Sequence, residues 1–382
     1  MTPKQRVIAA LQHREPDRVP WGEWQYDHNV VSMIIGRETF IGAKFRLTKA
    51  YWDGRRDEIV ESFKRDEVDF IRGLPLDLVH APLVPPRGHK PAAMKQLDAE
   101  TYEDAAGNLH RISATTGNLL LYRQSQKLGP EPTLDSLVYR PPAPPDQSEY
   151  ELARHLIKEL GQTHFIALRG PALGWPLVGR TPEERYMSLA EKPDLCRRVA
   201  ENSGRAAIER LRQLDLTGVD GIFSGADYSH NLGPFASPKF FRELILPHLQ
   251  EMARYIHSKG LFWLYHACGN NWALMDLFVE AGFDAYQAIQ ASAGMDMKLL
   301  KERYGHKLAF IGGVKNENLI LGRPDDVRAD ALYALKHGAP GGGYIYGASH
   351  SLAVGAKPAN LDAMRRTLAD FGAYPIRVPD EN

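Results

Sequence analysis

The sequence has few cysteines, and this scarcity excludes one common way of stabilising a fold. Only Cys196 and Cys268 occur among 382 residues, so we expect no disulfide framework, and a reducing compartment suits the chain. Long apolar runs are also missing, since no stretch of about 18 apolar residues is present to span a bilayer. The N-terminus lacks the basic-then-apolar pattern of a signal peptide. We therefore expect a cytoplasmic protein with no membrane partner.

An excess of charge of either sign is also absent. Lys and Arg together number 47, as do Asp and Glu, so the net charge is zero when His is neutral. Such a balance gives no basic surface for nucleic acid or for an anionic membrane. The 43% apolar and 25% charged residues are ordinary for a globular protein. The length suits one large domain or two of average size.

Apolar segments alternate with amphipathic helical patterns along most of the chain. The predicted strands lie in residues 18–24, 68–73, 164–169, 218–225, 261–271, 283–289, 308–313 and 344–346. Eight strands separated by helices predict the α/β class and a (β/α)8 TIM barrel. A doubly wound open sheet is the main alternative. It would need a Gly-rich phosphate loop after the first strand, and residues 21–25, Trp-Gly-Glu-Trp-Gln, do not resemble one.

Residues 80–150 interrupt this alternation. Proline is dense at both ends of the region, and hairpin signals occur at residues 106–108 and 116–118. We therefore predict a single barrel domain over residues 1–382, with a β-rich flap inserted after the second strand at about residues 80–150.

Two of the predicted strands lead into side chains that can bind a metal. His266 and Cys268 stand two residues apart, so in an extended backbone they project from the same side. An imidazole and a thiol in this arrangement make half of a zinc site. The strand at 344–346 is followed by a third potential ligand, His350. The spacing alone leaves a structural role open, because a buried Cys is commonly only a small apolar side chain.

Other polar side chains recur at the predicted strand ends, where barrel enzymes hold their active sites. They are Glu23, Asp77, Asp227, Tyr228, His230, Asn231, Gln287, Gln290, Lys315 and Asn316. Aromatic residues near the same ends are candidates for the wall of a substrate pocket, although each one alone is more commonly core packing. These are Trp21, Trp24, Trp175, Tyr228 and Tyr346. The pattern favours a metal-dependent site at this end of the barrel.

Several motifs resemble those of the uroporphyrinogen decarboxylase superfamily. Met-Thr-Pro-Lys-Gln-Arg-Val-Ile-Ala-Ala-Leu at 1–11, Glu-Pro-Asp-Arg-Val-Pro at 15–20 and the run 227–238 are similar to its typical segments. His-Ala-Cys-Gly at 266–269 resembles the zinc motif of the cobalamin-dependent methyltransferase branch. Gly-Gly-Gly-Tyr at 341–344 and Pro-Ala-Asn at 358–360 resemble the closing strand and helix of that branch. These segments are spread over almost the whole chain.

This resemblance implies a corrinoid-dependent methyltransferase of the O-demethylase type. The implied zinc ligands are His266, Cys268 and His350, the last at the position of a second Cys in the branch. A fourth position would take substrate, water or a carboxylate such as Glu23. The candidate catalytic residues are Glu23, Asp227, Tyr228 and Asn231. The resemblance also implies a corrinoid (cobalamin) carried by a partner protein, and a small methyl donor such as a methoxylated aromatic.

Three other activities stay open at this point. The protein could transfer a methyl group from a methylcorrinoid to a thiol or a folate. It could be a zinc hydrolase with Asp227 or Glu23 as the base, or it could decarboxylate uroporphyrinogen. Decarboxylases of the superfamily grip the acidic arms of the tetrapyrrole with an Arg-rich motif after the first strand. This sequence resembles them poorly there, because residues 21–26 read Trp-Gly-Glu-Trp-Gln-Tyr and contain no Arg.

Overall fold

A curled parallel sheet forms the centre of the protein, whose computed structural model describes residues 1–125 and 129–379. Seven strands follow the order β1-β6-β7-β10-β11-β12-β13, and all neighbours run parallel. Their bounds are β1 Leu78–Ala81, β6 Phe165–Arg169, β7 Gly221–Gly225, β10 Phe262–His266, β11 Ala285–Gln287, β12 Ala309–Val314 and β13 Tyr344–Ala348. The strands are short, apolar and buried, as expected for a parallel sheet covered on both faces.

The gap between β13 and β1 contains an extended segment instead of a regular strand. Trp21 forms an isolated parallel bridge with Tyr346. The N–H of Gly22 donates to the Tyr346 carbonyl at 2.9 Å, and the N–H of Asp77 donates to the Trp21 carbonyl at 2.8 Å. The predicted first strand is therefore held by a few backbone hydrogen bonds to β13 and to the start of β1, without forming a regular strand. The barrel-like fold is confirmed, with seven regular strands in this sheet among the described residues and no complete closure of the sheet.

The strand predicted at residues 68–73 is wrong. These residues are the end of helix α4 (Arg56–Gly73), and strand β1 begins at Leu78. A short apolar run fits either a strand or the buried face of a helix. Here the run continues a three-to-four-residue spacing of buried side chains through Val60 and Phe70, and this spacing places it in the helix.

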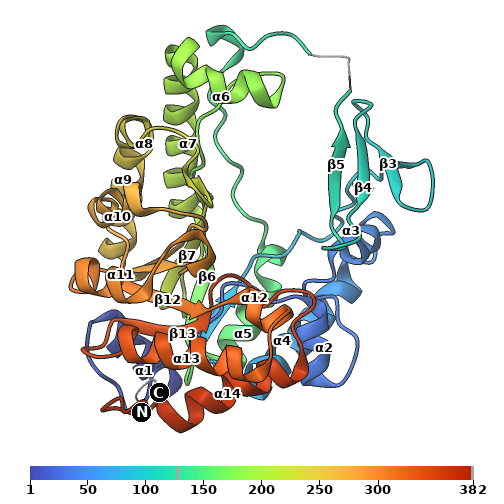
Figure 1. The fold of residues 1–382 in the computed structure, drawn as a ribbon. Coiled ribbons are helices and arrows are strands. Elements are labelled where there is room, and N and C mark those ends of the chain that lie inside the picture. Colours follow the sequence, from blue (N-terminus) through green and yellow to red (C-terminus); the bar gives the residue numbers. More distant parts are fainter. Residues whose placement is uncertain (126–128, 380–382) are drawn as a thin grey trace.

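The chain also contains many helices, most of which pack around the outside of the sheet (Figure 1). Besides α4 they are α1 Pro3–Leu11, α2 His28–Ile35, α3 Lys44–Trp52, α5 Glu151–Leu160, α6 Pro182–Glu191, α7 Pro193–Gln213, α8 Pro238–Leu244, α9 Leu246–Ser258, α10 Met275–Ala281, α11 Met297–Tyr304, α12 Asn316–Ile320, α13 Pro324–Gly338 and α14 Pro358–Phe371. Helices near in sequence pack together, such as α4 with α5 and α13 with α14. Within the described chain, no helix combines the length and the apolar character that crossing a membrane requires.

Apolar side chains fill the inside of the curled sheet. Phe165, Phe223, Leu264 and Ile345 belong to this inner cluster, together with residues of α1. Helix α1 lies at the amino ends of the strands, since the N–H of Lys4 donates to the carbonyl of Thr163, which precedes β6. Trp24 joins the same cluster and stacks on His266 at the end of β10. It therefore forms the floor of the opposite, carboxyl-terminal end.

The inserted region is rich in β structure, as predicted. An antiparallel sheet of order β2-β3-β4-β5 (Lys95–Gln96, Thr101–Glu103, Leu109–Ile112, Leu119–Arg123) turns where the hairpin signals occur. The Tyr102 ring packs against Phe45 and Trp52 of α3, at centroid distances of 4.9 and 5.7 Å. The side chain of Gln124 donates to the Arg180 carbonyl at 2.6 Å. The insertion thus extends from α3 to the segment before α6 (Figure 1); residues 126–128 of the predicted flap lie outside the described residues.

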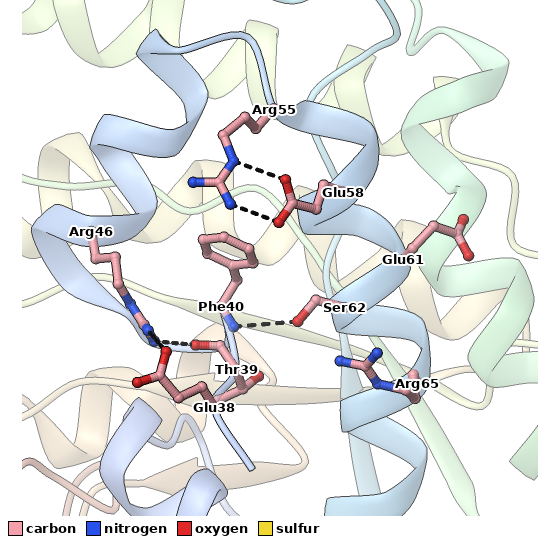
Figure 2. Close-up of a pocket in the computed structure, with 9 residues that line it drawn as sticks. All are labelled: Glu38, Thr39, Phe40, Arg46, Arg55, Glu58, Glu61, Ser62 and Arg65. Carbon is pink, nitrogen blue, oxygen red and sulfur yellow. Dashed lines mark hydrogen bonds and ion pairs between the residues drawn. The ribbon is translucent and has the colours of Figure 1, made fainter.

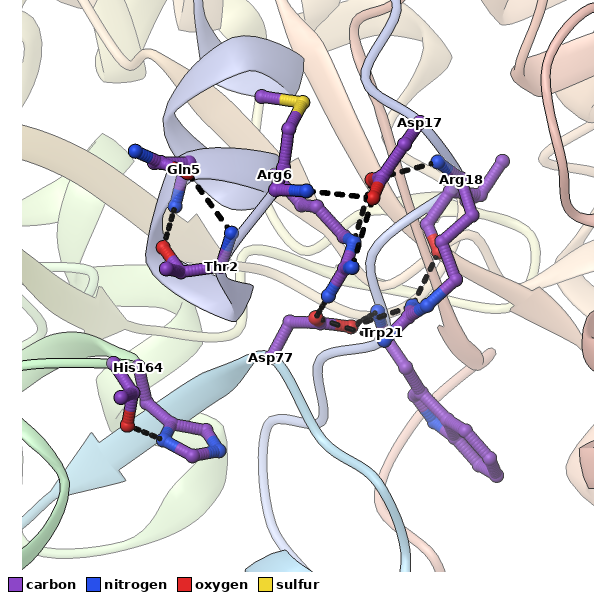
Figure 3. A network of polar contacts seen from close by, with 11 residues as sticks. Thr2, Gln5, Arg6, Asp17, Arg18, Trp21, Asp77 and His164 are labelled. Carbon is purple, nitrogen blue, oxygen red and sulfur yellow. Dashed lines mark hydrogen bonds and ion pairs between the residues drawn. The ribbon is translucent and has the colours of Figure 1, made fainter.

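A charged network ties the amino-terminal segment to the start of β1 (Figure 3). The buried Asp77 carboxylate accepts hydrogen bonds from Arg6 at 3.2 Å, Arg18 at 2.8 Å and the backbone N–H of Trp21 at 2.8 Å. Arg6 also binds Asp17, and this contact holds the pKa of the Asp17 carboxyl well below its usual range. Asp77 precedes β1, so it lies at the amino-terminal end of the sheet. Its predicted place among the active-site residues is wrong, because it followed from the misplaced strand at 68–73.

Candidate functional site

Two residues of the candidate site lie at the carboxyl end of β10. His266 is the last residue of the strand, and Cys268 follows two positions later. Gly269 then turns the chain with φ of +86°, and a Cβ there would lie 2.6 Å from the Ser229 carbonyl oxygen. Glycine is needed at this position because a side chain would be both strained and obstructed. Its N–H donates to the Gln290 side chain at 2.9 Å, which anchors the turn beside Cys268.

The structure brings the three predicted zinc ligands together. One ligand atom from each of His266, Cys268 and His350 lies within 4.8 Å of the others. The two imidazole rings meet edge to face, with centroids 5.2 Å apart. Ligand atoms around tetrahedral zinc are separated by roughly 3.5 Å, so a small inward movement of the side chains would give zinc-binding distances. One thiol and two imidazoles are a donor set that suits zinc.

Gln287 fixes the orientation of His266. The two residues are register partners in the β10–β11 pair, and the Gln287 side-chain carbonyl accepts a hydrogen bond from His266 Nδ1. An amide oxygen can only accept, so the proton lies on Nδ1 and the Nε2 lone pair is available to a metal. The Gln287 amide nitrogen lies 3.4 Å from the backbone carbonyl of His350. One side chain therefore links two of the three candidate ligands.

Burial keeps His266 and Cys268 uncharged in the absence of a metal. It lowers the pKa of His266 to about 4, and a neutral imidazole is the metal-binding form. It raises the pKa of Cys268 to about 12, with a further contribution from the charge of Asp227. The thiol donates to Asp227 Oδ1 at 3.2 Å, and the same oxygen lies 3.7 Å from His266 Nε2. Asp227 follows β7 and thus belongs to the same site.

His350 follows β13 and is partly buried. Its Nδ1 accepts a hydrogen bond from the N–H of Ser351 at 2.7 Å, which places the proton of the neutral ring on Nε2. Ligation through Nε2 therefore requires the other tautomer and release of the Ser351 contact. The side chain of Asn316 donates to the Ser351 carbonyl at 2.7 Å and holds this loop in place.

Glu23 lies buried beside the same strand. Its carboxylate accepts from the Trp21 indole at 2.7 Å and from the backbone N–H of Ala348 at 3.1 Å. Burial raises its pKa to about 8, so the carboxyl is mostly protonated at neutral pH. These contacts do not place Glu23 among the clustered ligand atoms of His266, Cys268 and His350.

The other predicted site residues lie around the cluster or away from it. Tyr228 is fully buried, and its hydroxyl contacts the Leu173 carbonyl and the Tyr265 hydroxyl. Asn231 is exposed in the turn between β8 (Ser229–His230) and β9 (Gly233–Pro234), and its side chain lies 3.4 Å from that of Gln290. Lys315 pairs with Asp330 at 3.0 Å. The structure therefore does not bring Tyr228 and Lys315 to the candidate ligands.

Trp24 is the aromatic candidate that contacts the cluster. Its ring stacks on His266 with a centroid distance of 4.8 Å and an angle of 5°. Trp21 packs edge-on against Tyr346, and Trp175 donates to the Tyr228 carbonyl at 3.1 Å; both are contacts of core side chains. Two residues beside Trp24 were not predicted, His80 near the end of β1 and Arg169 at the end of β6. Arg169 lies at the end of a correctly predicted strand, so selecting polar residues at strand ends would have found it. His80 was missed because the second strand was predicted at residues 68–73.

Another hollow, of about 500 Å³, lies elsewhere, between the segment before α3 and helix α4 (Figure 2). Its charges are compensated within the protein. Arg55 forms a two-point ion pair with Glu58, and Arg46 pairs with Glu38. Arg46 and Arg55 also lie over the Phe40 ring. Glu61 and Arg65 are likewise paired, with Lys64 and Asp66, so the charged residues described in this hollow all have partners within the protein.

Fold and site together define an α/β barrel-like protein with metal-type ligands at the carboxyl ends of its parallel strands. The chain belongs to the uroporphyrinogen decarboxylase (URO-D) family, because the sequence profile of that family matches residues 151–371, more than half of the chain. No curated protein sequence matches it.

Solved structures agree with this fold. A methyltransferase from Methanosarcina mazei superposes with a TM-score of 0.63 and 17% identity, covering 97% of this chain and 99% of that one. At this identity the likeness shows the fold alone. A chitinase from Chromobacterium violaceum reaches a TM-score of 0.34 at 11% identity over 57% of this chain and 84% of that one. A likeness this low carries no argument.

Proposed function

We propose that this protein is a zinc-dependent methyltransferase, which moves a methyl group between a small substrate and the cobalt of a corrinoid carried by a separate protein. The observation that carries the proposal is the convergence of His266, Cys268 and His350 at the strand ends. The fold shared with a protein named as a methyltransferase supports it. A separate corrinoid carrier is supported by the sequence, which contains no Asp-x-His-x-x-Gly motif of corrinoid-binding proteins.

The residues present suit a zinc ion, and the residues around it have different roles. When bound, zinc held by one thiolate and two neutral imidazoles carries a net positive charge and acts as a Lewis acid on a substrate oxygen. Gln287 holds His266 in the metal-binding tautomer. Asp227 Oδ1 stands at 3.2 Å from the Cys268 sulfur and can accept the thiol proton that metal binding releases. Trp24 covers the inner side of the site and excludes water from it.

The first test is metal content. The purified protein should contain one zinc per chain, and Cys268→Ala or His350→Ala should lose most of it, as measured by elemental analysis. Both variants should keep the fold, because a catalytic metal does not hold a large barrel together. Undiminished zinc in His350→Ala would remove this residue from the ligand set.

The second test is activity. Free cob(I)alamin should be methylated in the presence of the protein and a suitable donor, screened across methoxy, thiol and amine compounds by the change in corrinoid absorbance. A zinc hydrolase is the second candidate, because Asp227 lies beside the cluster where a general base would be needed. A hydrolase would turn over without any corrinoid, and this outcome would replace the methyltransferase proposal.

A further inference from the structure

The backbone turn that carries Cys268 folds around one fully buried side chain, that of Asn271. The side-chain nitrogen of Asn271, Nδ2, lies 3.0 Å from the carbonyl oxygens of Ala267 and Cys268. It lies 3.4 Å from the carbonyl oxygen of Gly269. Carbonyl oxygens only accept hydrogen bonds, so the amide must present its NH2 group to them, and this decides which way the amide lies. One side chain therefore holds three successive peptide groups of the turn.

The same amide joins the turn to the structures on both sides of it. Its oxygen, Oδ1, accepts a hydrogen bond at 2.8 Å from the buried hydroxyl of Ser229, a residue of β8, which follows β7 in the chain. On the other side, the Tyr286 hydroxyl of β11 lies 3.1 Å from Nδ2 and donates to the Ala267 carbonyl at 2.8 Å. Strands β7 and β11 are the two neighbours of β10 in the sheet. Asn271 therefore fixes the turn relative to both neighbouring strands.

Cys268 itself has few contacts that could hold its thiol in one place. The residue is only partly buried, and its sulfur forms one hydrogen bond, to the exposed Asp227 at 3.2 Å. The position of the thiol thus depends on the backbone of the turn. Within the described residues, the carbonyls of Cys268 and Gly269 accept no hydrogen bond other than that of Asn271. Removal of this amide would leave both carbonyls without a partner in the protein.

We propose that Asn271 is a positioning residue of the candidate metal centre, which holds the Cys268 thiol where it can bind a metal together with the two candidate histidine ligands. The inference rests on the proposed function and adds to it the side chain that sets the geometry of the thiol. Asn271 makes no hydrogen bond to the side chain of a candidate ligand in the described structure, so it acts on the metal through the backbone. Gln287 differs in this respect, because it contacts the imidazole of His266 directly.

Titration of the metal-free protein with cobalt(II) tests this role. Cobalt(II) accepts the same types of ligand as zinc, and the sulfur-to-cobalt absorption band reports the bond to Cys268. Asn271→Leu approximately keeps the volume of the side chain and removes its hydrogen bonds to the turn. This variant should bind cobalt(II) about tenfold more weakly or worse, with a lower absorbance per bound metal. Ser229→Ala removes only the partner of Oδ1, so it should keep the fold and weaken binding by about threefold to fivefold.

Asn360→Leu is the matched control, because Asn360 is buried and bonded in the same manner. It is fully buried at the start of α14. Its Nδ2 donates to the backbone carbonyls of Asn318, Leu319 and Gly322 at 2.9, 3.1 and 3.0 Å. It therefore supports α12 and the residues after it, and no part of the turn that carries Cys268. The control variant should be destabilised in a similar way and keep the absorbance per bound cobalt(II).

Hydrogen exchange of the backbone amides of residues 267–271, measured without metal, reports the turn directly. Asn271→Leu should speed up this exchange by about fivefold or more, whereas Asn360→Leu should leave it unchanged. Wild-type cobalt(II) affinity and absorbance in correctly folded Asn271→Leu would overturn the proposal. Equal losses in Asn271→Leu and Asn360→Leu would also overturn it, because they would follow from general destabilisation.

The same measurements separate this inference from the proposed function. Cobalt(II) binding that depends on Asn271, without methyl transfer to cob(I)alamin by the wild type, would contradict the proposed function alone. Methyl transfer by the wild type, together with unimpaired cobalt(II) binding in Asn271→Leu, would contradict the role of Asn271 alone.

Discussion

Gln287 shows how a side chain that does not bind the metal can control metal affinity. It accepts the Nδ1 proton of His266 and thereby keeps Nε2 available. Gln287→Leu should lower zinc affinity by about 10–100-fold, because the imidazole can then rotate or change tautomer. Gln287→Glu retains the acceptor and should recover most of the affinity.

Competition titration against a chromophoric chelator measures this effect. Gln250→Leu is the control, since Gln250 is a partly buried residue on α9, and its side chain donates to the Glu280 carbonyl away from the candidate ligands. Equal zinc affinity in Gln287→Leu and the wild type would mean that packing against Trp24 is sufficient to hold His266.

Glu67 makes the stability of the protein depend on pH. Burial raises its pKa from 4.5 to about 8, and the Tyr26 hydroxyl opposes this rise in part. Below 4.5 the carboxyl is protonated in both the folded and the unfolded state. Between 4.5 and about 8 the unfolded state ionises while the folded state keeps the proton, so stability falls as the pH rises.

Glu67→Gln should remove the contribution of Glu67 to this dependence, because its amide does not titrate, while the contribution of Glu23 should remain. Relative to the wild type, the variant should gain on the order of 4 kcal/mol in free energy of unfolding between the two ends of that pH range. Urea unfolding of both proteins at each end measures the difference. A constant difference between variant and wild type would show that Glu67 ionises normally in the folded protein.

The order of strands and helices was predictable where a segment was apolar and bounded by glycine or proline, as in β7, β10 and β12. The ends of α4 and β1 were not, because a six-residue segment whose apolar side chains are Val68, Phe70 and Ile71 suits either element. The candidate ligands His266, Cys268 and His350 were also predictable, because imidazole and thiol groups are chemically distinctive. The role of Gln287 was not, since it depends on the register between β10 and β11.

The inserted sheet is attached to the barrel through few side chains. Tyr102 is buried between Phe45 and Trp52 of α3. Tyr102→Ala should detach this contact, so limited proteolysis within residues 95–123 should become faster. The melting temperature should change little, because the cores of the curled sheet do not include Tyr102.

Tyr122→Ala is the matched control, because this side chain on β5 is 59% exposed. It should leave the cleavage pattern unchanged. Equal cleavage of the wild type and Tyr102→Ala would indicate that other contacts, such as that of Gln124 with Arg180, suffice to hold the sheet.

The molecule as a whole shows that membership of a family does not fix the reaction. Decarboxylases of the superfamily have an Arg-rich motif after the first strand. In this protein the buried residues Trp21 and Glu23 occupy that segment. Glu23 contributes an acidic group, and its contacts are with the protein. The cavity beside Trp24, at the carboxyl ends of β1 and β6, has a volume of about 290 Å³, and Arg169 is the one arginine among the described residues that line it. Neither property suits a tetrapyrrole with several acidic arms.

Uroporphyrinogen should therefore not be decarboxylated by this protein. Anaerobic incubation followed by chromatography of the oxidised porphyrins measures the product directly. We expect no coproporphyrinogen above the level of a heat-inactivated control, because several carboxylates need several guanidinium partners and the site offers one. Arg169→Gln should not alter this null result. Formation of coproporphyrinogen by the wild type would place the chain with the decarboxylases, and the cluster of His266, Cys268 and His350 would then need a role other than methyl transfer.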